Sequence, residues 1–251
     1  MTQISVVIIT FNEERNIERC ILSVKNVADE IIVVDAFSTD KTEEICKKHN
    51  VNFVQRKFDG YSNQKNFANS LTSNPFILSL DADEELSNEL IDSILKIKMN
   101  PKFDVFYFNR KSNYCGKWIK HGGWYPDSQF RLFDKSKVKW NKSIVHERIE
   151  YDKNTSVGFL KGDLLHYTIA TNEEHLKVID KYSTLKSIEM FEKGRKANFL
   201  KIIFATIFKF LKHYILKLGF LDGYFGFKIA LNSAYSSYLK YAKLRKLNAN
   251  E

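Results

Sequence analysis

The stretch Leu78-Ser79-Leu80-Asp81-Ala82-Asp83-Glu84-Glu85 decides the fold, because an apolar run ends there in a cluster of acids. Residues 76–80 are nearly continuously apolar, as in a strand that is buried on both faces. Asp81 and Asp83 precede the next predicted helix by several residues, so N-capping does not explain both of them. Two carboxylates this close repel each other unless a cation lies between them, which predicts a Mg²⁺ or Mn²⁺ site.

The same organisation extends backward to the N-terminus. Strands are predicted at residues 4–9, 31–35, 51–55 and 76–80, and helices at 14–24, 40–49, 62–71 and 87–99. Alternation of strand and helix implies right-handed crossovers and a parallel sheet, so the fold class is α/β. Ligands of such sheets bind beyond the carboxyl ends of the strands, so those residues are the first candidates for a site.

Polar residues follow three of these strands. Thr10, Phe11, Asn12 and Glu13 follow the first strand, and Asp35 ends the second. Acids in these places also suit the first turns of helices, an explanation that serves Asp40 and Glu14 equally well. Carboxylates from three strand ends are expected to converge on one edge of the sheet.

Four segments in order carry a resemblance to a known family. They are ISVVIITFNEE at 4–14, IIVVDAFSTDKT at 31–42, QKNFA at 64–68 and LSLDADEE at 78–85. Together they resemble the family-2 glycosyltransferases of the GT-A fold, a Rossmann-like, mostly parallel sheet flanked by helices. The resemblance implies transfer of a sugar from a nucleoside diphosphate donor, with inversion at the anomeric carbon.

The resemblance also implies roles for individual residues. Thr10, Phe11, Asn12 and Glu13 would line the nucleoside pocket, Asp35 would contact the base or ribose, and Lys65 would lie near the nucleotide. Asp81 and Asp83 would take the donor-ribose and metal-diphosphate roles. No glycine-rich phosphate loop is present, so a metal is expected to neutralise the departing diphosphate.

Residues 101–170 are predicted to form the acceptor half of a catalytic domain at 1–170, with strand-like segments at 103–119 and 128–135. An inverting transfer needs one general base, and Asp127 in the segment GGWYPD is the candidate. Trp124 and Tyr125 would raise its pKa and stack on a sugar ring. The alternative is that Pro126, Asp127 and Ser128 only form a turn.

Further candidates for acceptor or phosphate contacts lie downstream. They are Arg131, His146 and Glu147, with His146 also a candidate metal ligand, whereas His166 is expected to be structural. This run resembles the bacterial lipopolysaccharide inner-core β-glucosyltransferases, a likeness that covers nearly the whole chain. It implies glucose donated by UDP to a lipopolysaccharide-core or other lipid-linked acceptor. The Gln-x-x-Arg-Trp motif of processive synthases is absent, so processive synthesis is not expected.

The net charge of +9 in 251 residues is confined to the C-terminal segment. Residues 195–251 hold eleven basic and two acidic residues, so residues 1–194 are balanced. Residues 171–251 are predicted to be a helical extension, opening with a capping box at Thr171 and Glu174. A second helix at 199–218, ending at Gly219, places lysines on one half and apolar side chains on the other.

This extension predicts contact with an anionic surface. An in-plane helix on an anionic membrane fits the pattern, as does a helix docked on the catalytic domain with its lysines in water. A nucleic-acid-binding protein is the alternative function, although the balanced body and the lack of a recognised motif disfavour it. Three widely spaced cysteines suggest neither a disulfide framework nor a zinc site. The expected location is cytoplasmic, on the inner face of the membrane.

Overall fold

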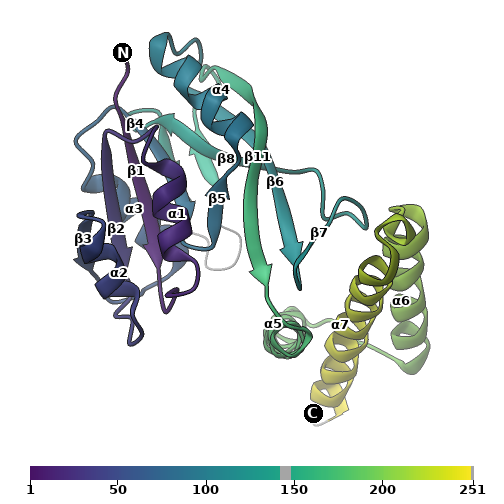
Figure 1. Ribbon diagram of the computed structural model, residues 1–251. Coiled ribbons are helices and arrows are strands. Elements are labelled where there is room, and N and C mark those ends of the chain that lie inside the picture. Colours follow the sequence, from purple (N-terminus) through teal and green to yellow (C-terminus); the bar gives the residue numbers. More distant parts are fainter. Residues whose placement is uncertain (142–147, 250–251) are drawn as a thin grey trace. The chain divides into compact units, whose positions relative to one another are not determined.

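The computed structural model describes residues 1–141 and 148–249 (Figure 1). The chain divides into two compact units. Unit 1 comprises Met1–Arg110 and Asp127–Tyr167, and unit 2 comprises Lys111–Pro126 and Thr168–Glu251. No helix among the described residues is both long and apolar enough to span a bilayer.

Unit 1 is built on the predicted parallel sheet. Its strands β1 (Ile4–Thr10), β2 (Glu30–Asp35), β3 (Asn52–Gln55) and β4 (Phe76–Asp81) lie in the order β3-β2-β1-β4 and are parallel. Helices α1 (Ile17–Val24), α2 (Thr42–Lys48), α3 (Tyr61–Ser70) and α4 (Asn88–Met99) alternate with them. The four strands and four helices expected from the sequence are confirmed.

Alternation of side chains along β1 explains why helices cover both faces of this sheet. Val6 and Ile8 belong to the core that includes α1 and α4, whereas Val7 and Ile9 belong to the core that includes Ala68 of α3. All seven residues of β1 are buried. The sheet is therefore the middle layer of three, and its carboxyl edge remains the place for a site.

Beyond β4 the sheet becomes antiparallel, so it is mixed rather than mostly parallel. The order continues through β8 (Asp127–Asp134), β6 (Val105–Tyr114), β11 (Val157–Ile169) and β5 (Glu84–Leu86). β7 (Lys117–Trp118) pairs with β6, and β9 (Val138–Trp140) with β10 (Ile149–Tyr151). The strand-like segments 103–119 and 128–135 are confirmed in β6, β7 and β8, but β5 and β11 were not predicted.

Part of the acidic cluster forms the short strand β5. Its Glu84 pairs with His166 of β11 in an antiparallel register. Gly162 of β11 (φ +100°) permits the close approach to α4, because a Cβ there would lie 2.2 Å from the backbone nitrogen of Leu90. Glu84 and Glu85 therefore belong to a strand rather than to a solvated loop.

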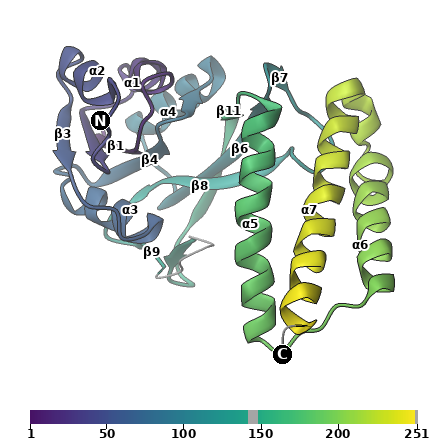
Figure 2. The same cartoon turned by 90° about the horizontal axis from the view of Figure 1, so that it is seen from below.

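Unit 2 is a layer of three helices, α5 (Asn172–Glu192), α6 (Phe199–Leu211) and α7 (Gly223–Ala249), with α7 between the other two (Figure 2). The capping box of Thr171 and Glu174 is confirmed. The helix expected at 199–218 changes at Lys212 into a π-helical turn, η1 (Lys212–Leu216). Leu218 (φ 57°), not Gly219, takes the left-handed position, because Gly219 opens the 3₁₀ turn η2 (Gly219–Asp222).

Residues 111–126 group with these helices, although the sequence placed them in the acceptor half. The Asp222 carboxylate accepts hydrogen bonds from the backbone N–H groups of Lys120 and His121, at 3.2 and 2.7 Å. His213 Nδ1 lies 2.7 Å from the Gly122 carbonyl oxygen. The loop that precedes Asp127 is thus anchored by the segment between α6 and α7.

Candidate functional site

The loops after β1 and β2 are joined by short hydrogen bonds. Asn12 (φ 55°) donates its backbone N–H to Ser38 Oγ at 2.8 Å, and its side-chain oxygen accepts from the Thr39 N–H at 2.8 Å. Asp35 is fully buried and accepts from the Ser38 N–H at 2.8 Å. Residues that the sequence assigned to the nucleoside pocket are therefore adjacent here.

Other members of this predicted pocket differ in exposure. Phe11 is 55% exposed, which leaves its ring free to meet a ligand, whereas Thr10 is buried. The Thr10 hydroxyl has no hydrogen-bond partner among the described residues. Burial raises the pKa of Glu13, as do the charges of Asp83 and Asp40, against the opposing hydrogen bond from Asn16 at 2.7 Å.

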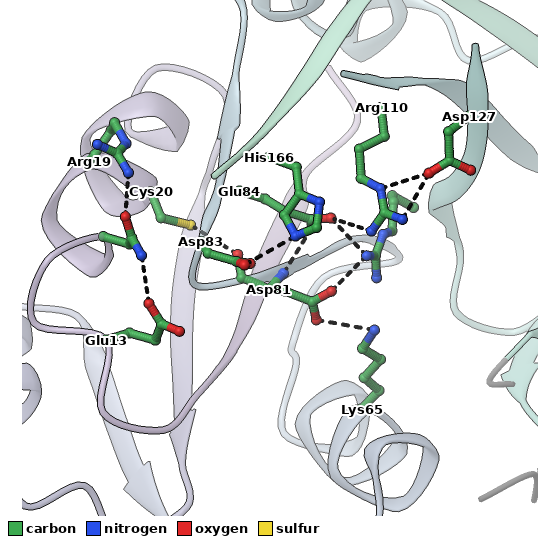
Figure 3. Close-up of polar contacts among 12 residues, drawn as sticks. Glu13, Arg19, Cys20, Lys65, Asp81, Asp83, Glu84, Arg110, Asp127 and His166 are labelled. Atoms are coloured by element: carbon green, nitrogen blue, oxygen red, sulfur yellow. Dashed lines mark hydrogen bonds and ion pairs between the residues drawn. The ribbon is translucent and has the colours of Figure 1, made fainter. Parts of the chain in front are cut away.

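Asp81, at the end of β4, is held between two cations (Figure 3). Its Oδ1 lies 3.1 Å from Lys65 Nζ, and its Oδ2 lies 2.7 Å from Arg131 Nη2. Burial opposes its ionisation, but Arg131 and Lys65 outweigh burial and hold the pKa of Asp81 well below its usual range. Asp81 is therefore a carboxylate whose two oxygens are already engaged.

Glu84 continues this alternation of charges. It is completely buried, and its Oε1 lies 2.9 Å from Arg131 Nη2 and 3.5 Å from Arg110 Nη1. Its other oxygen accepts a hydrogen bond from the Asp81 N–H at 2.9 Å. Arg110 in turn donates from Nε to Asp127 Oδ2 at 2.9 Å. A chain of ion pairs thus runs from Lys65 through Asp81, Arg131, Glu84 and Arg110 to Asp127.

Asp127 begins β8 and is partly exposed. Gln129 donates to its Oδ1 at 2.9 Å, while Arg110 binds Oδ2. Trp124 and Tyr125, which were predicted to lie beside this carboxylate, belong to unit 2, where Trp124 packs edge-on against Tyr114. The neighbours that the structure gives to Asp127 are polar, because Arg110 from β6 faces it across the antiparallel register.

Asp83 points toward a different partner. Its Oδ2 lies 3.1 Å from His166 Nε2. Burial lowers the pKa of His166, but the bond to Asp83 and the charges of Asp83 and Glu84 outweigh this effect and raise it. His166, which the sequence treated as structural, therefore joins the site from β11.

The repulsion that predicted a metal is reduced here by protein groups, because Lys65 and Arg131 pair with Asp81, and His166 Nε2 lies 3.1 Å from Asp83. In residues 1–141 and 148–249, no three His, Cys, Asp or Glu side chains group as a metal site. Asp83 contacts His166 through Oδ2. A single carboxylate still fits a Mg²⁺ or Mn²⁺ ion whose other ligands are diphosphate oxygens and water.

The QKNFA segment shows why a lysine is buried in this site. Asn66 clamps the backbone of Trp140, donating to its carbonyl at 2.9 Å and accepting from its N–H at 3.0 Å. Lys65 Nζ lies 4.7 Å from the centre of the Trp140 ring and is 1% exposed. The indole therefore contacts the ammonium group that also pairs with Asp81.

Arg131 was expected to contact phosphate or acceptor. It is 3% exposed and turned toward Asp81 and Glu84, so we propose instead that it stabilises those carboxylates. His146 and Glu147 lie outside the described residues. Glu84, Arg110 and His166 were missed as site members, and only the length of the acidic run LSLDADEE pointed toward Glu84.

Polar side chains that meet beyond the carboxyl ends of parallel strands form the usual ligand site of an α/β protein. Residues 5–154 match the sequence model of glycosyl transferase family 2. The chain belongs to this family, it is a glycosyltransferase, and its architecture is the GT-A fold that the sequence predicted.

Similar proteins span nearly the whole chain. An uncharacterized glycosyltransferase of Rickettsia typhi is 32% identical over 266 residues, covering 99% of this chain and 88% of the relative. The lipopolysaccharide core biosynthesis glycosyltransferase LpsC of Rhizobium meliloti is 30% identical over 258 residues, covering 98% and 93%. Among solved structures, S. aureus TarS 1–349 matches with a TM-score of 0.47 and 14% identity, covering 99% of this chain and 92% of that chain.

Proposed function

We propose that the chain is an inverting hexosyltransferase that moves glucose from UDP-glucose to a lipopolysaccharide-core or other lipid-linked saccharide. The observation that carries the proposal is a site with two differently held carboxylates. Asp83 contacts His166 through one oxygen, and Asp127 is fixed by Arg110 and Gln129. An inverting transfer needs these two functions, leaving-group stabilisation and a general base, in separate groups.

The donor half of the reaction follows from the strand ends. Asn12, Glu13 and Asp35 would bind the nucleoside, with Phe11 stacking and Thr10 supplying a buried hydroxyl. Asp83 would hold Mg²⁺ or Mn²⁺, which supplies Lewis-acid stabilisation to the departing diphosphate. Lys65 would act through Asp81, keeping that carboxylate ionised and oriented toward the donor ribose.

Asp127 would act as the base. Arg110 and Gln129 orient its two oxygens, and the carboxylate would accept the proton of the acceptor hydroxyl. Removal of that proton makes the oxygen a stronger nucleophile, which attacks the anomeric carbon from the face opposite the leaving diphosphate. Inversion follows from this geometry, without a covalent intermediate on the enzyme.

The acceptor is proposed from LpsC, whose name connects it with lipopolysaccharide core biosynthesis. Trp124, Tyr125, His146 and Glu147 remain proposed acceptor contacts. A lipid-linked acceptor implies work at a membrane surface, and we place the enzyme on the cytoplasmic face of the inner membrane. Neither placement nor acceptor follows from the fold alone.

The test is a donor and acceptor screen with purified protein. UDP-, GDP- and ADP-sugars are offered with Mg²⁺, Mn²⁺ or EDTA, and transfer to lipid-linked saccharides is followed by mass spectrometry. We expect transfer from UDP-glucose that EDTA abolishes. Asp83→Ala should lose metal-dependent donor binding, whereas Asp127→Ala should lose transfer and keep donor binding. Asp92→Ala, an exposed carboxylate on α4, is the control, and near-normal turnover of Asp127→Ala would refute the base assignment.

A further inference from the structure

The helix α6 exposes its apolar face and packs through its other face. Of the 33 large hydrophobic side chains that are exposed in the described residues, 17 lie between Phe199 and Tyr238. Strongly exposed side chains on α6 are Leu200 (61%), Phe204 (68%), Ile207 (53%) and Phe208 (59%), besides Phe199 (60%) at its first position. At 100° per residue these side chains share one half of the helix.

The inward half of α6 is the one that the sequence described as basic. Ile202 is its only fully buried residue, and the Ala205 carbonyl accepts a hydrogen bond from Ser237 of α7. Burial lowers the pKa of Lys209, as do the charges of Lys240 and Lys212. Within unit 2, α6 therefore packs through the side that carries Ile202, Ala205 and Lys209.

A second apolar stripe lies on α7 and adjoins the first. It consists of Tyr224, Phe227, Leu231, Tyr235 and Tyr238, spaced three or four residues apart and all exposed. Phe227 lies 5.8 Å from Phe210 and 5.7 Å from Tyr214, ring centre to ring centre, so this stripe contacts aromatic rings of α6 and η1. We call the stripe of α7 together with Leu200, Phe204, Ile207 and Phe208 of α6 the outer apolar surface.

Charge identifies what covers this surface. Residues 195–251 hold the whole net charge of +9, and Lys196, Lys201 and Lys212 are exposed in and beside α6. A second copy of this chain would bring the same positive charge against it, which opposes self-association. An anionic lipid surface attracts these lysines and accepts aromatic and aliphatic side chains at its boundary.

We propose that the outer apolar surface inserts into the headgroup region of an anionic bilayer, led by Leu200, Phe204 and Phe208, with the lysines at its margin. Insertion of side chains, rather than attraction of a lysine face, is the main attachment. The proposal rests on the proposed function only in that a lipid-linked acceptor supplies the surface. The face of α6 that meets the lipid is the apolar one, as in the in-plane helix expected from the sequence, and the stripe of α7 is the addition.

The experiment uses the full chain, because deletion of 195–251 would remove Asp222 and His213, which anchor residues 120–122. Partition into vesicles of phosphatidylglycerol and phosphatidylcholine (30:70) is measured by co-sedimentation in 0.1 and 0.5 M NaCl. Phe204→Ser/Phe208→Ser should partition at least about tenfold more weakly at both salt concentrations, because it removes two large apolar groups. The matched control, Tyr182→Ser/Leu185→Ser on α5, alters side chains of similar exposure and should bind as wild type.

A second variant separates charge from insertion. Lys196→Gln/Lys212→Gln should weaken binding to anionic vesicles by about fivefold per lysine at 0.1 M NaCl, and much less at 0.5 M NaCl. Wild-type partition of the double serine variant of α6, with an unchanged circular dichroism spectrum, would overturn the proposal. A second result would also overturn it: the wild-type chain is a dimer in sedimentation velocity, and the double serine variant is a monomer that still binds vesicles. Loss of vesicle binding with retained donor hydrolysis supports it, and vesicle binding without any sugar transfer would refute only the proposed function.

Discussion

Replacing Glu84 by Gln should destabilise unit 1 far more than the same change at the neighbouring Glu85. Glu84 is completely buried and shared by Arg131 and Arg110, while its second oxygen accepts from the Asp81 N–H. Glutamine keeps the shape, but it removes the negative charge between two guanidinium groups. It also turns one acceptor into a donor, so either an N–H or a guanidinium loses its partner.

The size of the effect follows from burial. Removing one partner of a buried ion pair costs about 3–5 kcal/mol, because the opposite charge stays buried without compensation. Glu85 is 26% exposed, lies 3.6 Å from Arg19 and accepts from the Tyr167 hydroxyl at 2.7 Å. Glutamine still accepts from that hydroxyl, and loss of an exposed ion pair costs about 0–1 kcal/mol.

Hydrogen exchange measured by mass spectrometry is the suitable assay, since two units need not unfold together. Peptides from β4 and β8 should exchange in Glu84→Gln with an opening free energy lower by about 3–5 kcal/mol. The same peptides in Glu85→Gln should change by less than about 1 kcal/mol. Equal protection in the two variants would refute the view that Glu84 holds the charged network together.

Three further predictions address the network and unit 2. Arg110→Lys should slow transfer by roughly 10- to 100-fold without a change in UDP affinity. The reason is that a single ammonium group does not hold both Asp127 and Glu84 as the guanidinium does. Steady-state kinetics measures the rate, and calorimetric titration with UDP measures the affinity. Lys65→Met should weaken UDP-sugar binding by leaving Asp81 with one cation, and unchanged binding by calorimetry would contradict the role of Lys65. Burial lowers the pKa of His175 and of His213, the latter against its bond to the Gly122 carbonyl, so unfolding takes up protons below about pH 6.5 and unit 2 should lose stability as pH falls through that value. Urea unfolding between pH 5 and 8 should show this slope, and His175→Gln/His213→Gln should flatten it.

The parallel half of the sheet was predictable because its strands are buried on both faces. Such strands are short apolar runs that end where polar residues begin, and β1 is buried throughout. The three-residue strand β5 carries no such signal, since its sequence is Glu84-Glu85-Leu86. It exists because β11 pairs with it, and that partner lies about 80 residues away in the chain.

The acidic residues of the site could be predicted because they follow the strands in the sequence. The basic residues that pair with them could not be predicted in this way. Arg131 lies 50 residues from Asp81, and His166 lies 83 residues from Asp83. The sequence shows that Arg110 and Arg131 lie on strands, but strand register decides which carboxylate each one meets. The metal was therefore inferred from repulsion between aspartates, whereas in the structure Lys65 and Arg131 pair with Asp81 and His166 contacts Asp83.

The helix α6 shows how far a periodic pattern can be interpreted. Its sequence separates an apolar half from a lysine-rich half, yet this separation does not say which half packs. The apolar half of an amphipathic helix is usually expected to be buried, because the helix is assumed to be surrounded by water. Here the lysine-containing half packs. Ile202 is buried, the Ala205 carbonyl accepts a hydrogen bond from Ser237 of α7, and His213 in η1 lies 2.7 Å from the Gly122 carbonyl oxygen. Large side chains such as Phe204 then remain outside, an arrangement that is favourable when a lipid surface, rather than water, is their surroundings.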